Sequence, residues 1–135
     1  QALTRIKEFE MSINPIQIAG TGLLFLFTFI SGFWLSRSGK PFNVIILTIH
    51  KLISLAAAVL LGIVIHQINQ VAPLRTIELA AGVVTGLFFL GAVVSGGLLS
   101  TDKPMPPAIL AIHRTTPFLT VFSAAVTLYR LMTRV

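Results

Sequence analysis

The chain has 135 residues, of which 55% are hydrophobic and only 10% are charged, and its formal net charge is +6. Soluble domains of this size carry about 25% charged residues, so the composition argues against a water-soluble domain and favours an integral membrane protein. The basic residues are scattered near predicted helix ends without interleaved aromatics, which indicates contacts with the lipid bilayer and no nucleic-acid partner. The absence of cysteine excludes disulfides, thiolate metal sites and thioether-linked haem.

The N-terminal segment, Gln1–Ser12, is polar, with Leu3, Ile6 and Phe9 on a three-residue spacing. This spacing predicts a short amphipathic helix that lies on the membrane surface. The alternative is a frayed end without a fixed structure.

Four apolar stretches follow, at about 13–35, 42–67, 76–99 and 107–131. Each reaches the roughly 20 residues that a helix needs to cross a bilayer. The connections between them are short, so neighbouring helices should pack antiparallel. The sequence therefore predicts an all-α, up-down-up-down four-helix membrane bundle that forms a single transmembrane domain over residues 1–135.

Two features of these stretches bear on packing. The first stretch ends with Trp34, which we expect at the headgroup boundary, where indole rings are enriched. The third stretch carries Gly82 and Gly86, and glycines four residues apart let helix backbones approach closely. Glycines that face the bundle interior would also leave room for a flat cofactor.

The second half of the chain repeats the first. Aligning residues 31–51 with residues 95–114 gives 10 identities over 20 aligned positions. The matches include a Ser-Gly pair, a Lys-Pro step and a histidine that is followed by a basic residue. Because the copies are separated by two helices, we predict a duplicated helix pair, with parallel repeats related by an axis along the membrane normal.

The matched histidines are His50 and His113, which lie eight and six residues into their stretches, counted from Phe42 and Pro107. At a rise of 1.5 Å per residue they are roughly 12 and 9 Å below one membrane face. Both helices start from that face, so the spacing predicts two imidazole rings at similar depth on alternate helices.

Ionisable side chains inside a membrane are costly and usually functional. Two histidines are too few for a tetrahedral zinc site, whereas haem iron needs only two axial ligands from the protein. We therefore predict that His50 and His113 bind the iron of one non-covalent haem b. Ligation by two imidazoles fills both axial positions and favours electron transfer over oxygen binding. The alternative is that each histidine only bonds to a neighbouring hydroxyl or carbonyl group.

Lys51 and Arg114 follow the two histidines directly. A cation at this depth is unfavourable unless an anion compensates it. We predict that both residues take part in cofactor binding by pairing with haem propionates; the alternative is that they extend to lipid headgroups.

Pro117 stands four residues after His113 and cannot donate a hydrogen bond to its carbonyl oxygen. We expect a kink in the helix at this point. The hydroxyl of Thr115, Thr116 or Thr120 is expected to satisfy the carbonyl group.

The third histidine, His66, stands sixteen residues beyond the matched one, and its counterpart in the repeat is Tyr129. A second haem held by two histidines is therefore not predicted. We expect His66 to lie at the opposite membrane interface beside Gln67, Asn69 and Gln70, or to contact a quinone or a ligand shared with a partner chain.

This pattern, with His50-Lys51 and His113-Arg114 each preceded by a Lys-Pro turn, resembles the small b-type cytochromes of the cytochrome b561 and ferric-reductase-like transmembrane group. Members of that group often hold two haems through four histidines, so the single matched pair implies one haem here. The resemblance implies an electron-transfer protein rather than a stand-alone enzyme. Its expected partners are subunits of a larger redox complex, for which it would be the anchor, or further copies of itself, and a quinone.

The acidic residues, Glu8, Glu10, Glu78 and Asp102, all lie near predicted helix ends, so no carboxylate pair is available for acid–base catalysis. The competing function is a cofactor-free membrane transporter or assembly subunit whose histidine pair binds a metal ion or a proton. The distribution of basic residues slightly favours cytoplasmic termini. The expected location is the bacterial inner (cytoplasmic) membrane.

Overall fold

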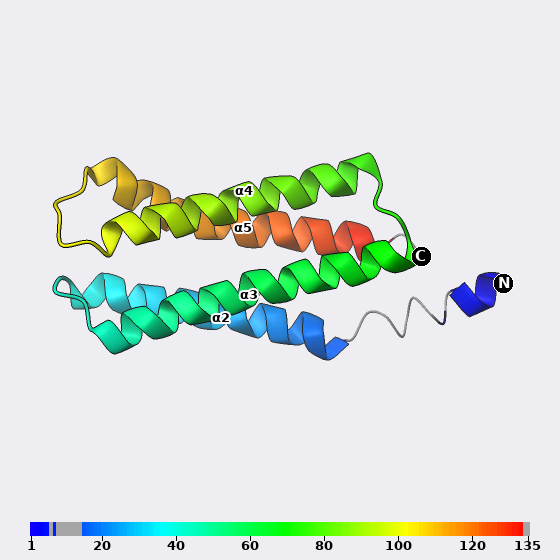
Figure 1. The fold of residues 1–135 in the computed structure, drawn as a ribbon, viewed down its shortest axis with the longest axis horizontal. Helices are drawn as coiled ribbons and strands as arrows, with labels where there is room; N and C mark the ends of the chain where they lie inside the picture. Colours follow the sequence, from blue (N-terminus) through cyan, green and yellow to red (C-terminus); the bar gives the residue numbers. More distant parts are fainter. Residues whose placement is uncertain (6, 8–14, 134–135) are drawn as a thin grey trace. The chain divides into compact units, whose positions relative to one another are not determined.

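The computed structural model describes residues 1–5, 7 and 15–133, and these residues contain no strand. Four long helices follow one another in the order α2 (Pro15–Ser38), α3 (Val44–Val71), α4 (Thr76–Leu99) and α5 (Pro107–Met132) (Figure 1). The predicted all-α, four-helix class is confirmed. Of the predicted N-terminal surface helix, residues 2–5 and 7 are helical and the remainder lies outside the described residues.

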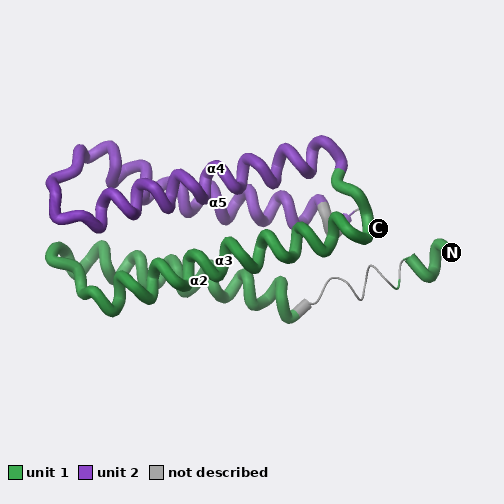
Figure 2. The backbone as a smooth tube through the Cα atoms, viewed as in Figure 1, with its two compact units in different colours: residues 1–74, 135 green, residues 75–134 purple. Residues whose placement is uncertain are grey.

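The chain divides into two compact units (Figure 2). Unit 1 contains α2 and α3, and unit 2 contains α4 and α5. In unit 1, Gly20 lies against Leu60 while Ser31 lies against His50, so α2 and α3 run antiparallel. In unit 2, Thr85 lies against Thr127 while Ser95 lies against His113, so α4 and α5 also run antiparallel.

The first hairpin turns at Gly39, whose φ of +68° suits a residue without a Cβ atom. The helix α3 then begins at Val44 rather than at the predicted Phe42. Asn43 caps it, because its side-chain oxygen accepts the backbone N–H groups of Ile45 and Ile46 at 2.9 and 3.2 Å. The helix also continues to Val71, beyond the apolar stretch, and the backbone N–H of Ala72 donates to the Ile68 carbonyl at its end.

The two helices of the second hairpin begin with different local contacts. At the start of α4, the Glu78 carboxylate accepts the backbone N–H of Arg75 at 2.6 Å and is buried. At the start of α5, Pro107 occupies the first turn, where a missing N–H donor has little effect. Both starts agree with the positions predicted from the sequence.

The two helices of each hairpin pack along a narrow line of buried residues, which we call the seam. Along α3 these residues recur at a nearly heptad spacing. In unit 1 the buried seam residues of α3 are aliphatic: Ala57, Leu61, Val64 and Ile68. In unit 2 the buried positions include hydroxyl side chains on both helices: Thr85, Ser95, Thr120 and Thr127. The two hairpins thus share a packing geometry but differ in the chemistry of the seam.

Glycine spacing alone did not identify the close contacts in unit 2. No described atom lies within 4 Å of a Cβ built at Gly82 or Gly86, so this pair makes no close contact with α5. The close contacts instead lie at Gly91, where a Cβ would be 3.4 Å from Thr116, and at Gly96.

All four helices are long and apolar enough to cross a membrane. Large apolar side chains remain exposed on their outer faces, and Ile45 and Phe122, for example, are each 70% exposed. Such surfaces are suited to lipid rather than to water. Length and composition therefore indicate a membrane protein, while the kind of membrane stays a prediction.

Candidate functional site

His50 is held within unit 1 by a serine of the neighbouring helix. Its Nδ1 atom lies 2.9 Å from the hydroxyl oxygen of Ser31. Both residues are half-buried, and they come from α2 and α3 at the end of the hairpin that carries the Lys-Pro turn. The imidazole ring is thus fixed at a defined position on the seam.

Gly32 gives this ring its space. A Cβ atom built on Gly32 would lie 3.0 Å from Cε1 of His50, which is tighter than ordinary van der Waals contact. Because Gly32 has no Cβ atom, the ring can lie directly against the backbone of α2. We call the set of Ser31, Gly32 and His50 the clasp of unit 1.

Unit 2 repeats this arrangement with Ser95, Gly96 and His113, which form the clasp of unit 2. The His113 Nδ1 atom lies 3.2 Å from the Ser95 hydroxyl oxygen and 3.0 Å from the Ala92 carbonyl oxygen. A Cβ on Gly96 would lie only 2.7 Å from Cε1 of the ring. The sequence repeat therefore corresponds to a repeated three-dimensional motif.

The hydrogen-bond partners of each clasp bear on which ring nitrogen of the histidine carries the proton. A carbonyl oxygen only accepts hydrogen bonds, so Nδ1 of His113 must be the donor to Ala92. In the neutral ring the lone pair is then on Nε2. At His50 the Ser31 hydroxyl has the Phe27 carbonyl as an acceptor at 2.8 Å, and when it donates there its oxygen can accept from Nδ1 at 2.9 Å.

The two histidines occupy equivalent positions in their helices. His50 lies six residues after the start of α3 at Val44, and His113 lies six residues after the start of α5 at Pro107. Each is therefore about 9 Å along its own helix axis. The sequence predicted unequal distances of the two histidines from their helix starts. This is corrected because α3, capped by Asn43, starts two residues later than predicted.

The main-chain carbonyls of the two histidines have different surroundings. The His50 carbonyl accepts the Ser54 hydroxyl at 2.6 Å, whereas Pro117 stands at the corresponding position in α5. The helix α5 nevertheless continues through Pro117.

The predicted threonine partners of the His113 carbonyl bond elsewhere, which corrects the prediction. The hydroxyls of Thr115, Thr116 and Thr120 donate to the carbonyls of Ala111, Ile112 and Thr116, respectively. Each hydroxyl reaches the carbonyl four residues before its own position. Only residue 117 stands four residues after His113, and it is a proline.

Lys51 and Arg114 are both exposed, one position after the clasp histidines on α3 and α5. Exposure of the side chain leaves each cation able to extend along its helix toward an anion. Whether that anion is a haem propionate or a lipid headgroup stays a prediction.

His66 does not join the clasp of unit 1. It is exposed on α3, sixteen residues and therefore about 24 Å from His50 along the helix. Its Nε2 atom lies 3.4 Å from the Gln70 side-chain nitrogen. The predicted proximity of His66 to this polar helix end is confirmed.

The donor set limits which metal groups the chain could hold. Among the residues that the structure describes, no three or more His, Asp or Glu side chains gather as a metal-binding group. A tetrahedral zinc site takes three or four protein ligands, whereas haem takes four ligands from the porphyrin and needs two from the protein.

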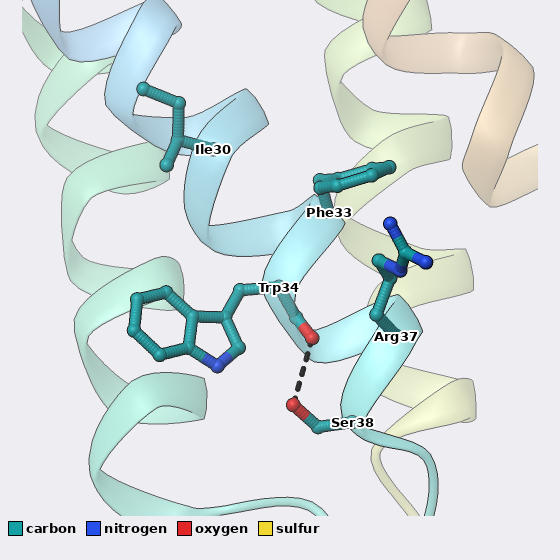
Figure 3. A pocket seen from close by; sticks show the side chains of 5 residues that line it. All are labelled: Ile30, Phe33, Trp34, Arg37 and Ser38. Carbon is teal, nitrogen blue, oxygen red and sulfur yellow. Dashed lines mark hydrogen bonds between the residues drawn. The ribbon is translucent and has the colours of Figure 1, made fainter.

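A shallow hollow on α2 has neither clasp histidine among its lining residues (Figure 3). Its lining residues are Ile30, Phe33, Trp34, Arg37 and Ser38. The Arg37 guanidinium lies 5.6 Å from the centre of the Phe33 ring, and Trp34 is 61% exposed. Exposed aromatic and basic side chains are typical of the end of a membrane-spanning helix, and the headgroup position of Trp34 stays a prediction.

The Ser-Gly pairs indicate duplication in the sequence, but their contacts with the histidines were not predicted. The signal was present: each pair precedes its histidine by a similar interval, nineteen residues from Ser31 to His50 and eighteen from Ser95 to His113. In a tight antiparallel hairpin such residues come level with each other across the seam. The whole chain matches no protein-family model, no curated protein and no solved structure.

Proposed function

We propose that this protein is a membrane b-type cytochrome of the cytochrome b561 and ferric-reductase-like kind. In this proposal His50 and His113 supply the two axial ligands of one non-covalent haem b, and the protein transfers single electrons. The repeated clasp carries the proposal, because it holds one imidazole ring in the same way in each hairpin.

The chemistry of the clasp fits such a ligand. Histidines that bind metals usually donate their other ring N–H to a carbonyl or similar acceptor, which fixes the ring and raises the basicity of the binding nitrogen. The Nδ1 atom of His113 has such an acceptor in Ala92, and Nδ1 of His50 has the Ser31 hydroxyl. In each ring Nε2 would then be the nitrogen that binds the iron.

The protein's own part in electron transfer is to hold the ligands and to control their surroundings. Bound haem would supply the reversible one-electron chemistry, and two imidazoles would leave no axial position for oxygen. The apolar helices keep water from the ligands, and burial of this kind tunes the reduction potential. Lys51 and Arg114, adjacent to the ligands, are proposed to pair with the propionate groups.

The wider setting is part of the proposal. The exposed apolar faces of the helices suit a role as the membrane anchor of a larger redox complex or as a homo-oligomer. A quinone is the proposed small-molecule partner, and the bacterial inner (cytoplasmic) membrane is the proposed location.

The visible spectrum of the full chain, purified in detergent from haem-replete cells, tests the proposal. We expect a Soret band and, after reduction, an α band. The variants His50→Ala and His113→Ala should each lose the haem, whereas His66→Ala, the matched control, should retain it.

Two outcomes would overturn this proposal. One is a wild-type protein that folds but shows no Soret band even after reconstitution with haem. The other is full haem retention in both His50→Ala and His113→Ala. The first result would favour the competing, cofactor-free function, in which the hydrogen-bonded histidines bind a metal ion or a proton. The second would show that other residues hold the haem.

A further inference from the structure

We propose that Ser31 and Ser95 are positioning residues that fix the clasp histidines in the Nδ1–H tautomer before any haem binds. The proposal rests on the proposed function for its consequence, because the fixed tautomer presents Nε2 as the ligating nitrogen. It concerns groups of the chain itself and can be tested without the cofactor.

The first step is the direction of the serine hydroxyl. Ser31 donates to the carbonyls of its own helix, Phe27 at 2.8 Å and Thr28 at 3.1 Å. Ser95 does the same with Gly91 at 2.6 Å and Ala92 at 3.2 Å. A hydroxyl has one proton, so each serine oxygen is left as an acceptor toward the histidine.

The second step is the ring nitrogen that meets this acceptor. In both clasps the serine oxygen lies by Nδ1, at 2.9 Å for His50 and 3.2 Å for His113. An acceptor at Nδ1 stabilises the proton there and leaves the lone pair on Nε2. At His113 the Ala92 carbonyl, at 3.0 Å from Nδ1, reinforces this choice.

The third step is the fixed ring plane. Gly32 and Gly96 bring the helix backbone against Cε1, the ring atom between the two nitrogens. The glycine leaves room for the ring in this plane. Within that plane, flipping the ring by 180° would put the carbon Cδ2 in place of Nδ1, and the hydrogen bond to the serine would be lost. The serine and glycine together therefore determine both the proton and the orientation of the ring.

The experiment measures ring ¹⁵N chemical shifts of histidines in the full-length haem-free protein, alongside haem affinity. The variants are Ser31→Ala and Ser95→Ala, with Ser31→Thr and Ser95→Thr as conservative controls that keep the hydroxyl. We expect wild-type His50 and His113 in the Nδ1–H form. Ser31→Ala should shift His50 toward the Nε2–H form and weaken haem binding by about 10- to 100-fold, as is usual for such partners of a ligand.

For Ser95→Ala we expect a smaller loss of affinity with the proton still on Nδ1, because the Ala92 carbonyl remains as its acceptor. The threonine variants should keep the wild-type tautomer, and circular dichroism should confirm that every variant is folded. His66, which lies outside the clasps, provides an internal reference signal.

The outcomes separate this inference from the proposed function. Wild-type histidines in the Nε2–H form, or a folded Ser31→Ala protein with unchanged tautomer and haem affinity, would overturn the positioning role even if haem binds. A wild-type protein with both rings in the Nδ1–H form that takes up no haem would support the positioning of the rings and refute the cytochrome proposal.

Discussion

Unit 1 and unit 2 hold a histidine in the same way but surround it differently. Both use a serine at Nδ1 and a glycine against the ring. Along the seam, however, Val64 of unit 1 corresponds in the repeat to Thr127 of unit 2, and Ser54 corresponds to Pro117. The two halves therefore share the clasp although the residues around it differ.

The hydroxyl groups of the unit 2 seam do not form a separate polar site. Thr85, Thr120 and Thr127 each donate to a carbonyl four residues earlier in their own helix, at 2.8 to 2.9 Å. Buried hydroxyls are tolerated when they are bonded in this way. The difference between the two seams thus concerns packing, whereas the shared clasp concerns the ring nitrogens.

The strongest way to break the equivalence of the clasps is to add a methyl group beneath each ring. In Gly96→Ala the new Cβ would lie 2.7 Å from the His113 ring, compared with 3.0 Å from the His50 ring in Gly32→Ala. We expect Gly96→Ala to displace the ring, to lower the free energy of unfolding by about 1 to 3 kcal/mol, and to cause the larger loss of haem. Detergent unfolding and haem titration measure both; equal effects of the two variants would contradict the compared geometry.

The next difference is the residue four positions after each histidine. Pro117→Ala restores a backbone N–H donor to α5 and should raise the free energy of unfolding by up to about 3 kcal/mol. The reciprocal Ser54→Pro should lower it, because it removes a backbone donor and the 2.6 Å hydroxyl bond to the His50 carbonyl. Unfolding followed by circular dichroism measures both; a destabilised Pro117→Ala protein would show that the proline has a role in packing.

A smaller effect distinguishes the starts of the second helices. Asn43→Ala removes the cap of α3 and should destabilise the protein by about 1 kcal/mol, whereas Asn43→Ser or Asn43→Asp should restore most of the loss. Amide hydrogen exchange of the first turn of α3 is the measurement. Unchanged protection in Asn43→Ala would contradict the assigned cap.

The smallest effect is expected from exchanging the seam residues themselves. Thr127→Val should change the free energy of unfolding by less than about 1 kcal/mol, because its hydroxyl bonds to its own helix. Chemical denaturation measures it, with Val64→Thr as the reciprocal change in unit 1. A loss of more than about 2 kcal/mol would show that the 3.5 Å approach of the Thr85 and Thr127 oxygens joins the two helices.

Apolar length and short connections were sufficient to predict the four helices, because few other structures satisfy such stretches in a membrane. The start of α3 was misplaced because hydropathy includes Phe42, whereas the helix is set by the Asn43 side chain. Asparagine is a strong capping residue, so this signal was available in the sequence.

The clasps were only half predictable. The repeat identified His50 and His113 and the Ser-Gly pairs, but the seam determines which side chains meet, and that depends on the angular position of each residue around its helix. The close contacts of Gly91 and Gly96 with α5 were not predicted for the same reason. The Ala92 carbonyl could not be predicted, since a main-chain acceptor leaves no mark in the sequence.

The most direct test of the central claim is the electron paramagnetic resonance spectrum, with near-infrared magnetic circular dichroism, of the ferric wild-type protein loaded with haem. Two imidazole ligands on one iron should give a low-spin ferric signal and the charge-transfer band of bis-histidine haem. That result would support His50 and His113 as ligands, provided that His66→Ala leaves the spectrum unchanged. A high-spin signal, or a low-spin signal with only one histidine ligand, would contradict the account.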